Sequence, residues 1–188
     1  MDRNFQYTPA PKPEPIYFES IIKGAEKPGG GLLVGQKFNV LKTVAIAQAD
    51  DKVRFIPVKG YRLVEAVKTT DTTIKIAKDS GVQEGDVIAH GKVGVACTKV
   101  DASTSEDYDV VTVKLGVAID AGTVLYQAKA ASANAAEPLA KPIYVLGTNY
   151  ASNTGDQEVR LINGANLRKE TANIADELVE LLPGINLV

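Results

Sequence analysis

The chain has very few of the residues on which most catalytic and metal sites depend. Its 188 residues include one cysteine, Cys97, one histidine, His90, and no tryptophan. A single cysteine excludes an internal disulfide and a four-cysteine zinc site. Without tryptophan, the core has to be built from Val, Ile, Leu and Ala. The same absence weakens the case for a carbohydrate-binding surface, since such surfaces commonly use flat aromatic rings.

The chain also has no excess of charge and no long apolar run. Its formal net charge is −2, whereas binding to nucleic acid normally requires a basic face. No run approaches the roughly 18 apolar residues of a membrane span. The first fifteen residues, MDRNFQYTPAPKPEP, are polar and proline-rich, unlike a secretory signal peptide. These features predict synthesis in the cytoplasm, with no nucleic acid and no membrane among the partners.

The few reactive residues are not spaced for chemistry. His90 has no carboxylate or cysteine at a recognisable catalytic spacing. The alternating segment 89–100 predicts one half-buried strand. Cys97 lies seven residues after His90, so along that strand the two side chains face opposite sides. Glu84 and Asp86 lie in a polar turn, where exposed carboxylates serve solubility. We therefore predict no catalytic residue, no cofactor and no metal, and a chain that is not an enzyme.

Most of the chain after residue 31 has the composition of β-strands. The clearest candidates are Val110–Ile119, Thr123–Ala128, Ile143–Leu146 and Glu158–Ile162. They are rich in Val, Ile, Leu and Tyr, and segments containing Gly, Asn, Ala and Pro separate them. Shorter candidates precede them at 38–47, 53–57 and 61–67, and 16–22 predicts a short strand or a helix start. We predict a mainly β fold, a β-sandwich or a barrel-like platform, over residues 32–188.

Residues 1–31 predict an extended arm rich in proline and glycine. Prolines at 9, 11, 13 and 15 alternate with other residues, and KPGGG follows at 27–31. Alternate prolines fix φ and remove backbone donors, which excludes a helix and a central strand. Phe5 and Tyr7 need a surface to pack against. Two interpretations remain open: a disordered tail, or an arm that docks on another subunit through Phe5 and Tyr7.

One helix is predicted, at about 167–182. Its apolar side is made of residues spaced by four, three, four and three positions: Leu167, Thr171, Ile174, Leu178 and Leu181. Asn166 is the candidate N-cap, and Pro183-Gly184 ends the segment. The stripe Leu167, Ile174, Leu178 and Leu181 is expected to pack on the sheet or on a symmetry mate. It is the main reason to predict a homotrimer.

Four segments of the second half of the chain carry a family resemblance. They are AIDAGTVLYQA at 118–128, EPLAKPIYVLGTN at 137–149, EVRLINGANLRKE at 158–170 and NIADELVELLPGINLV at 173–188. In this order they resemble the late strands and closing helix of head decoration and head-fibre proteins of tailed bacteriophages. Segment 65–88 is similar to β units common in phage virion proteins.

The resemblance implies a non-enzymatic structural protein of the virion. It implies trimers on the outside of the capsid, as decoration or as a head fibre, with the major capsid protein as partner. The alternative from the residues themselves is a β-sandwich module of a bacterial cell surface that binds a ligand or glycan. An enzyme with paired acidic residues is the least supported reading, because the chain shows no clustered His, Cys or paired carboxylates.

Overall fold

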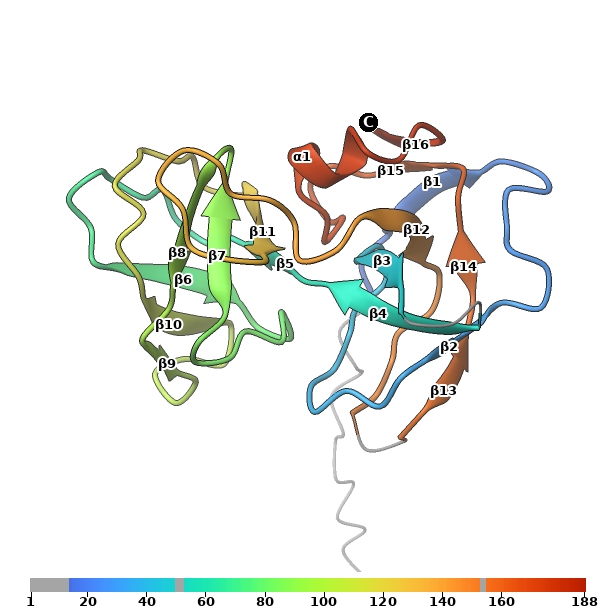
Figure 1. Ribbon diagram of the computed structural model, residues 1–188, viewed down its shortest axis with the longest axis horizontal. Coiled ribbons are helices and arrows are strands. Elements are labelled where there is room, and N and C mark those ends of the chain that lie inside the picture. Colours follow the sequence, from blue (N-terminus) through green and yellow to red (C-terminus); the bar gives the residue numbers. More distant parts are fainter. Residues whose placement is uncertain (1–13, 50–52, 153–154) are drawn as a thin grey trace, which may run out of the picture.

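The computed structural model describes residues 14–49, 53–152 and 155–188, and it shows two β-rich lobes side by side (Figure 1). Both ends of the described chain build one lobe, which we call the terminal lobe; residues 60–128 build the other, the inserted lobe. The chain crosses between them twice, at Val58–Gly60 and over residues 129–141. The predicted body therefore consists of two lobes.

The described residues of the terminal lobe form nine strands and a short helix. They are β1 (Phe18–Ile21), β2 (Gly31–Leu33), β3 (Ala45–Gln48), β4 (Arg54–Val58), β12 (Pro142–Leu146), β13 (Gln157–Val159), β14 (Leu161–Ile162), β15 (Ala165–Leu167), α1 (Asp176–Val179) and β16 (Ile185–Leu187). Six form a sheet in the order β13-β2-β4-β3-β12-β14. Its two end strands are separated in sequence only by Arg160, so the sheet nearly closes into a barrel. A second sheet, β1-β15-β16, lies beside this barrel (Figure 1).

The inserted lobe also curls around its own core. Its strands are β5 (Gly60–Arg62), β6 (Thr73–Ala77), β7 (Val87–His90), β8 (Val93–Ala96), β9 (Lys99–Asp101), β10 (Tyr108–Thr112) and β11 (Val124–Ala128). They form two sheets, β5-β11-β7-β8 and β6-β10-β9. A bridge between Leu63 and Ile76 joins the sheets on one side, and the short step from β8 to β9 joins them on the other. A mainly β, barrel-like fold is therefore confirmed.

Three apolar clusters hold the molecule together. One fills the six-stranded sheet around Phe55 and Leu161, and a second fills the inserted lobe around Ile76 and Leu125. The third spans both lobes, because Tyr126 of β11 packs in the same cluster as residues of the C-terminal segment. The two lobes thus share a buried apolar interface.

Tyrosine contributes more to the core than the sequence suggested. Tyr61, Tyr126 and Tyr150 are the largest fully buried side chains. Each hydroxyl has a polar partner: Tyr61 donates to Asp86, Tyr126 to the Gly91 carbonyl, and Tyr150 to a backbone carbonyl. A buried ring whose hydroxyl is satisfied can replace an aliphatic core residue without leaving a polar group unpaired. Val, Ile, Leu and Ala alone do not make this core.

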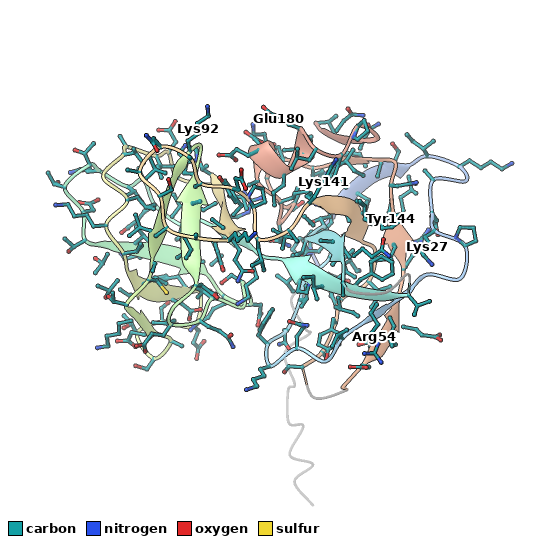
Figure 2. The ribbon with its side chains drawn as sticks, in the orientation of Figure 1. Lys27, Arg54, Lys92, Lys141, Tyr144 and Glu180 are labelled. Carbon is teal, nitrogen blue, oxygen red and sulfur yellow. The ribbon has the colours of Figure 1, made fainter. Side chains whose placement is uncertain are left out.

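Aromatic packing also occurs at the wall of the terminal lobe. The rings of Phe55 and Tyr144 lie 5.9 Å apart, edge to face at 77°. The Lys27 ammonium lies 5.8 Å from the centre of the Phe55 ring. Figure 2 labels Lys27 and Tyr144 in this lobe. Among the described residues, no helix is long and apolar enough to cross a membrane.

The predicted strands are present, with shifted ends. The segments predicted at 123–128 and 143–146 correspond to β11 and β12. The strand predicted at 110–119 ends already at Thr112, and the one at 158–162 is interrupted at Arg160. Segment 16–22 forms β1, which pairs with β15. The β-rich body therefore begins before residue 32.

The helix predicted at about 167–182 is wrong in its extent. Only Asp176–Val179 is helical, Ala175 is the N-cap without a side-chain bond, and Leu167 lies in β15. Pairing with distant strands explains the difference: β15 bonds antiparallel to β1 and parallel to β16. The apolar spacing is satisfied instead by a strand, a turn, one helical turn and a strand, which together cover one core.

Candidate functional site

His90 and Cys97 do not lie on one strand. β7 ends at His90, a turn at Gly91 and Lys92 follows, and β8 runs back beside it. Cys97 therefore lies opposite the start of β7, where its amide donates to the Asp86 carbonyl, while His90 is at the other end. The prediction of one continuous strand over 89–100 is therefore wrong. The two side chains nevertheless lie at opposite ends of the hairpin.

Cys97 is a core residue of the inserted lobe. It is 2% exposed, and its thiol donates to the Gln83 carbonyl at 2.9 Å. Burial raises the pKa of the Cys97 thiol above its ordinary value. A thiol held neutral in this way is a poor nucleophile.

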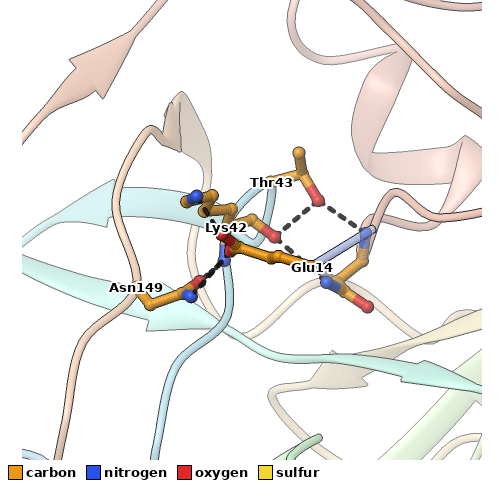
Figure 3. A network of polar contacts seen from close by, with 5 residues as sticks. Glu14, Lys42, Thr43 and Asn149 are labelled. Carbon is orange, nitrogen blue, oxygen red and sulfur yellow. Dashed lines mark hydrogen bonds and ion pairs between the residues drawn. The ribbon is translucent and has the colours of Figure 1, made fainter. Parts of the chain in front are cut away.

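Phe5 and Tyr7 lie outside the described residues, but the point where the arm meets the body is defined. The Glu14 carboxylate accepts hydrogen bonds from the Lys42 ammonium at 2.9 Å and from the Asn149 amide at 3.1 Å (Figure 3). The hydrogen bond and charge of Lys42 lower the pKa of the Glu14 carboxyl. Thr43 and Asn173 continue this network toward the C-terminal segment. The described chain thus starts at a fixed place on the terminal lobe.

The predicted packing stripe divides in two. Leu167, Ile174 and Leu178 are 0%, 2% and 0% exposed and belong to the core cluster that both lobes share. Leu181 is 39% exposed, and Leu182 takes its place in the core. Three of the four residues therefore pack within their own chain, and they are not available to a symmetry mate.

A buried ion pair that the sequence did not reveal lies where the chain first crosses between the lobes. The Lys59 ammonium contacts the Asp86 carboxylate at 2.8 Å and lies 4.2 Å from the centre of the Phe38 ring. Lys59 is 5% exposed. The same carboxylate accepts bonds from the Tyr61 hydroxyl and the Gln127 amide. Asp86 is therefore a structural hub and not a solubilising surface residue.

Arg62 is a second contact between the lobes. It extends from β5 and donates to the Gly122 carbonyl at 2.7 Å and to the Lys169 carbonyl at 3.0 Å, and it also bonds the Ala172 carbonyl. Removal from water lowers the pKa of the Arg62 guanidinium, although the Glu170 charge opposes this. Carbonyl capping by an arginine at a turn fixes the C-terminal segment against the inserted lobe. No spacing in the sequence marks Arg62 for this role.

A pocket of about 470 Å³ lies beside Arg62, between the lobes; we call it the interlobe pocket. The inserted lobe lines it with Arg62, His90 and residues 121–124. The terminal lobe contributes Lys169, Glu170, Ile174, Asp176, Glu177 and Leu187. These residues combine apolar surface with charges of both signs, and none of them is Phe, Tyr or Trp.

His90 belongs to this pocket and faces Glu177. Its Nδ1 lies 3.4 Å from Glu177 Oε1 and makes no hydrogen bond. The same Oε1 accepts a bond from the Gly91 amide at 2.5 Å. The contact becomes an ion pair only when the imidazole is protonated. His90 thus has one nearby carboxylate, which already holds the hairpin tip, and no nucleophile among its described neighbours.

Within residues 14–49, 53–152 and 155–188, no three His, Cys, Asp or Glu side chains gather as metal ligands would. No protein-family model matches the chain, and no curated protein and no solved structure shows significant similarity to it.

Proposed function

We propose that the chain is a non-enzymatic structural protein that decorates the outside of a tailed-phage or prophage capsid, as decoration or as a head fibre. The observation that carries the proposal is a two-lobed β body whose described chain starts at Glu14, directly after the proline-rich sequence of residues 1–13. Two barrel-like lobes share one apolar cluster, and Glu14 joins the arm to that body through Lys42 and Asn149. The resemblance of 118–188 to head decoration and head-fibre proteins supports the same function.

The proposed partners are the major capsid protein and further copies of this chain. A decoration protein acts by contact alone, and it has to match the local symmetry of a lattice, so a trimer suits a three-fold position. Synthesis takes place in the bacterial cytoplasm, and the final location is the capsid exterior. The arm supplies a contact that the compact lobes do not: an extended segment can add to a sheet edge through its main chain.

The test is co-sedimentation with purified heads of the phage or prophage whose genome encodes the chain. The intact protein should pellet with DNA-filled heads and saturate at a fixed number of copies for each capsid. A matched sample of tails from the same particle should not pellet it. Failure to bind expanded heads under any salt condition would refute the capsid function.

The second candidate is a ligand-binding module of a bacterial cell surface. The interlobe pocket favours it, because about 470 Å³ lies in the range of small-molecule sites. Its lining has no Phe, Tyr or Trp ring on which a sugar could stack, so a glycan is the less suitable ligand. Calorimetric titration with host cell-wall oligosaccharides distinguishes the two functions, because only the second function predicts a saturable heat of binding.

A further inference from the structure

The arm sequence alternates along its whole length. From residue 5 to residue 13 the odd positions are Phe, Tyr, Pro, Pro and Pro, and from 4 to 12 the even positions are Asn, Gln, Thr, Ala and Lys. In an extended chain, successive side chains point to opposite faces, so every second side chain shares a face. Residues 4–13 would therefore have one apolar and one polar face, which is the pattern of an edge strand covering a core.

The prolines restrict this strand to one pairing edge. The backbone N–H and C=O groups of successive residues also point to opposite edges of a strand, so those of every second residue share one edge. Pro9, Pro11 and Pro13 all remove donors from the same edge, whereas Thr8, Ala10 and Lys12 keep theirs on the other. Such a segment can add to a sheet but cannot be extended further, which is how natural edge strands avoid aggregation.

The strand β16 offers a matching free edge. In the sheet β1-β15-β16 it has one neighbour among the described strands. The Val188 amide donates to the Leu167 carbonyl, and the Ala165 amide donates to the Gly184 carbonyl. The backbone N–H and C=O groups of the even residues around β16 therefore point toward β15. The backbone groups of Leu187 therefore point away from β15. On this edge the Ile185 amide already donates to the Leu182 carbonyl, so Leu187 is the residue of β16 with which a further strand can pair.

The two faces of the acceptor sheet match those of the arm. On its outer face Ser20, Asn166 and Asn186 form a polar row with bonds of 3.0 and 3.2 Å between neighbours. On its inner face Ile185 is buried and Leu187 is half-buried in the core cluster. A fourth strand with polar even residues outside and aromatic odd residues inside would continue both faces.

Strand direction follows from this match. For a chain of L-residues, the strand direction decides which hydrogen-bonding edge belongs to the residues on a given face. In β16 the outward-facing Asn186 lies among the even residues whose backbone faces β15. The arm would lie on the edge of β16 opposite β15. Its outward-facing even residues must therefore point their N–H and C=O groups at β16 from that opposite edge. Only a strand parallel to β16 does so.

The interlobe pocket can receive the apolar face of this strand, because Leu187 of β16 is one of its lining residues. Glu170, Asp176 and Glu177 outnumber the permanent cations Arg62 and Lys169 at its wall. The arm has the opposite balance, since Arg3 and Lys12 outnumber Asp2. Apolar surface, charge and a free backbone edge thus meet at one place.

We propose that residues 4–13 of a second copy add as a parallel strand to β16 and place Phe5 and Tyr7 in the interlobe pocket. The arm of the same copy is poorly placed to pair with its own β16. Its chain enters β1 at the opposite edge of the same sheet, roughly 14 Å away at three strand spacings. Glu14 is also held at Lys42 and Asn149. Residue 13 is followed directly by Glu14, so the neighbouring copy has to place its β16 beside the Glu14 contact, and residues 4–13 then extend along it for about 33 Å. This proposal depends on the proposed function only for the expectation that copies of the chain assemble with one another.

The first test uses a fluorescein-labelled peptide of residues 1–14 and a body that lacks residues 1–13. The peptide should bind the body saturably. Ala10→Pro in the peptide removes a donor from the pairing edge and should weaken binding about tenfold. The matched change Pro11→Ala alters only the other edge and should leave binding within about twofold. Equal binding of the wild-type and A10P peptides would overturn the strand pairing.

The second test blocks the pocket. Ala121 is exposed at the pocket wall, so Ala121→Trp should fill the pocket without disturbing the core and abolish peptide binding. Ala102→Trp, at an exposed loop position of the same lobe that does not line the pocket, is the control. Circular dichroism verifies that both variants fold. If A121W binds the peptide as well as A102W does, the pocket is not the acceptor.

Sedimentation equilibrium decides which copy supplies the arm. The intact chain should self-associate more tightly than the chain without residues 1–13, and A121W should reduce its association likewise. An intact monomer that excludes the labelled peptide would show that its own arm fills the site, contrary to the proposal. Capsid co-sedimentation is independent: a body without the arm that still pellets with heads leaves the capsid function intact.

Discussion

The Lys59–Asp86 pair predicts a large coupling energy between two charged residues. The two groups are 2.8 Å apart, and their side chains are 6% and 11% exposed. We expect Asp86→Asn to destabilise the protein by about 3 kcal/mol, because it leaves a buried ammonium without a counter-charge. The Phe38 ring, 4.2 Å away, reduces this cost without replacing the carboxylate.

The reverse change should cost less. After Lys59→Met the Asp86 carboxylate still accepts bonds from the Tyr61 hydroxyl, the Gln83 amide and the Gln127 side chain. Bonds to a charged acceptor offset part of its desolvation, so we expect about 1–2 kcal/mol. The double variant removes both charges and keeps the volume. Its cost should fall well below the sum of the single changes, with a coupling of about 2 kcal/mol.

The assay is urea unfolding of the wild-type protein, both single variants and the double variant. Far-UV circular dichroism monitors the unfolding, because the chain has no tryptophan for fluorescence. Lys169 and Asp176 give the control cycle, because they are paired at 3.3 Å with side chains 66% and 64% exposed. An exposed pair of this kind should couple by no more than about 0.5 kcal/mol. If the two cycles give the same coupling, burial does not strengthen the Lys59–Asp86 pair and the reasoning is wrong.

Three further predictions remain; the trimer and the head attachment rest on the proposed function, and the thiol reactivity rests on the structure. Light scattering after size exclusion should give a mass near 60 kDa for a homotrimer of 19.9 kDa chains, and a mass near 20 kDa at micromolar concentration would contradict it. Because burial raises the pKa of Cys97, its thiol should resist Ellman's reagent at pH 8 until urea is added; rapid native labelling would place it at the surface. Deleting residues 1–13 should leave the unfolding temperature within a few degrees of the intact protein and weaken attachment to heads, since Glu14 and its contacts remain; equal co-sedimentation would exclude the arm as the attachment device.

Local patterns in the sequence determined the fold class. Runs of Val, Ile, Leu and Tyr separated by glycine and proline predicted strands that the structure contains, among them β11 and β12. These patterns work because a half-buried strand leaves an alternating record in its own residues. The alternation at 89–100 was also real, but the sequence did not show that a turn at Gly91 divides it into a hairpin.

Tertiary structure alone decided the C-terminal segment and the candidate site. The spacing of Leu167, Ile174 and Leu178 is compatible with a helix, yet β1, nearly 150 residues earlier, pairs with β15 and makes Leu167 part of a strand. Likewise, nothing near Asp86 in the sequence identifies Lys59, 27 residues earlier, as its partner. Local sequence records which face of a segment is apolar. It does not record which distant backbone edge or buried charge will meet that segment, because those contacts form only when the chain has folded.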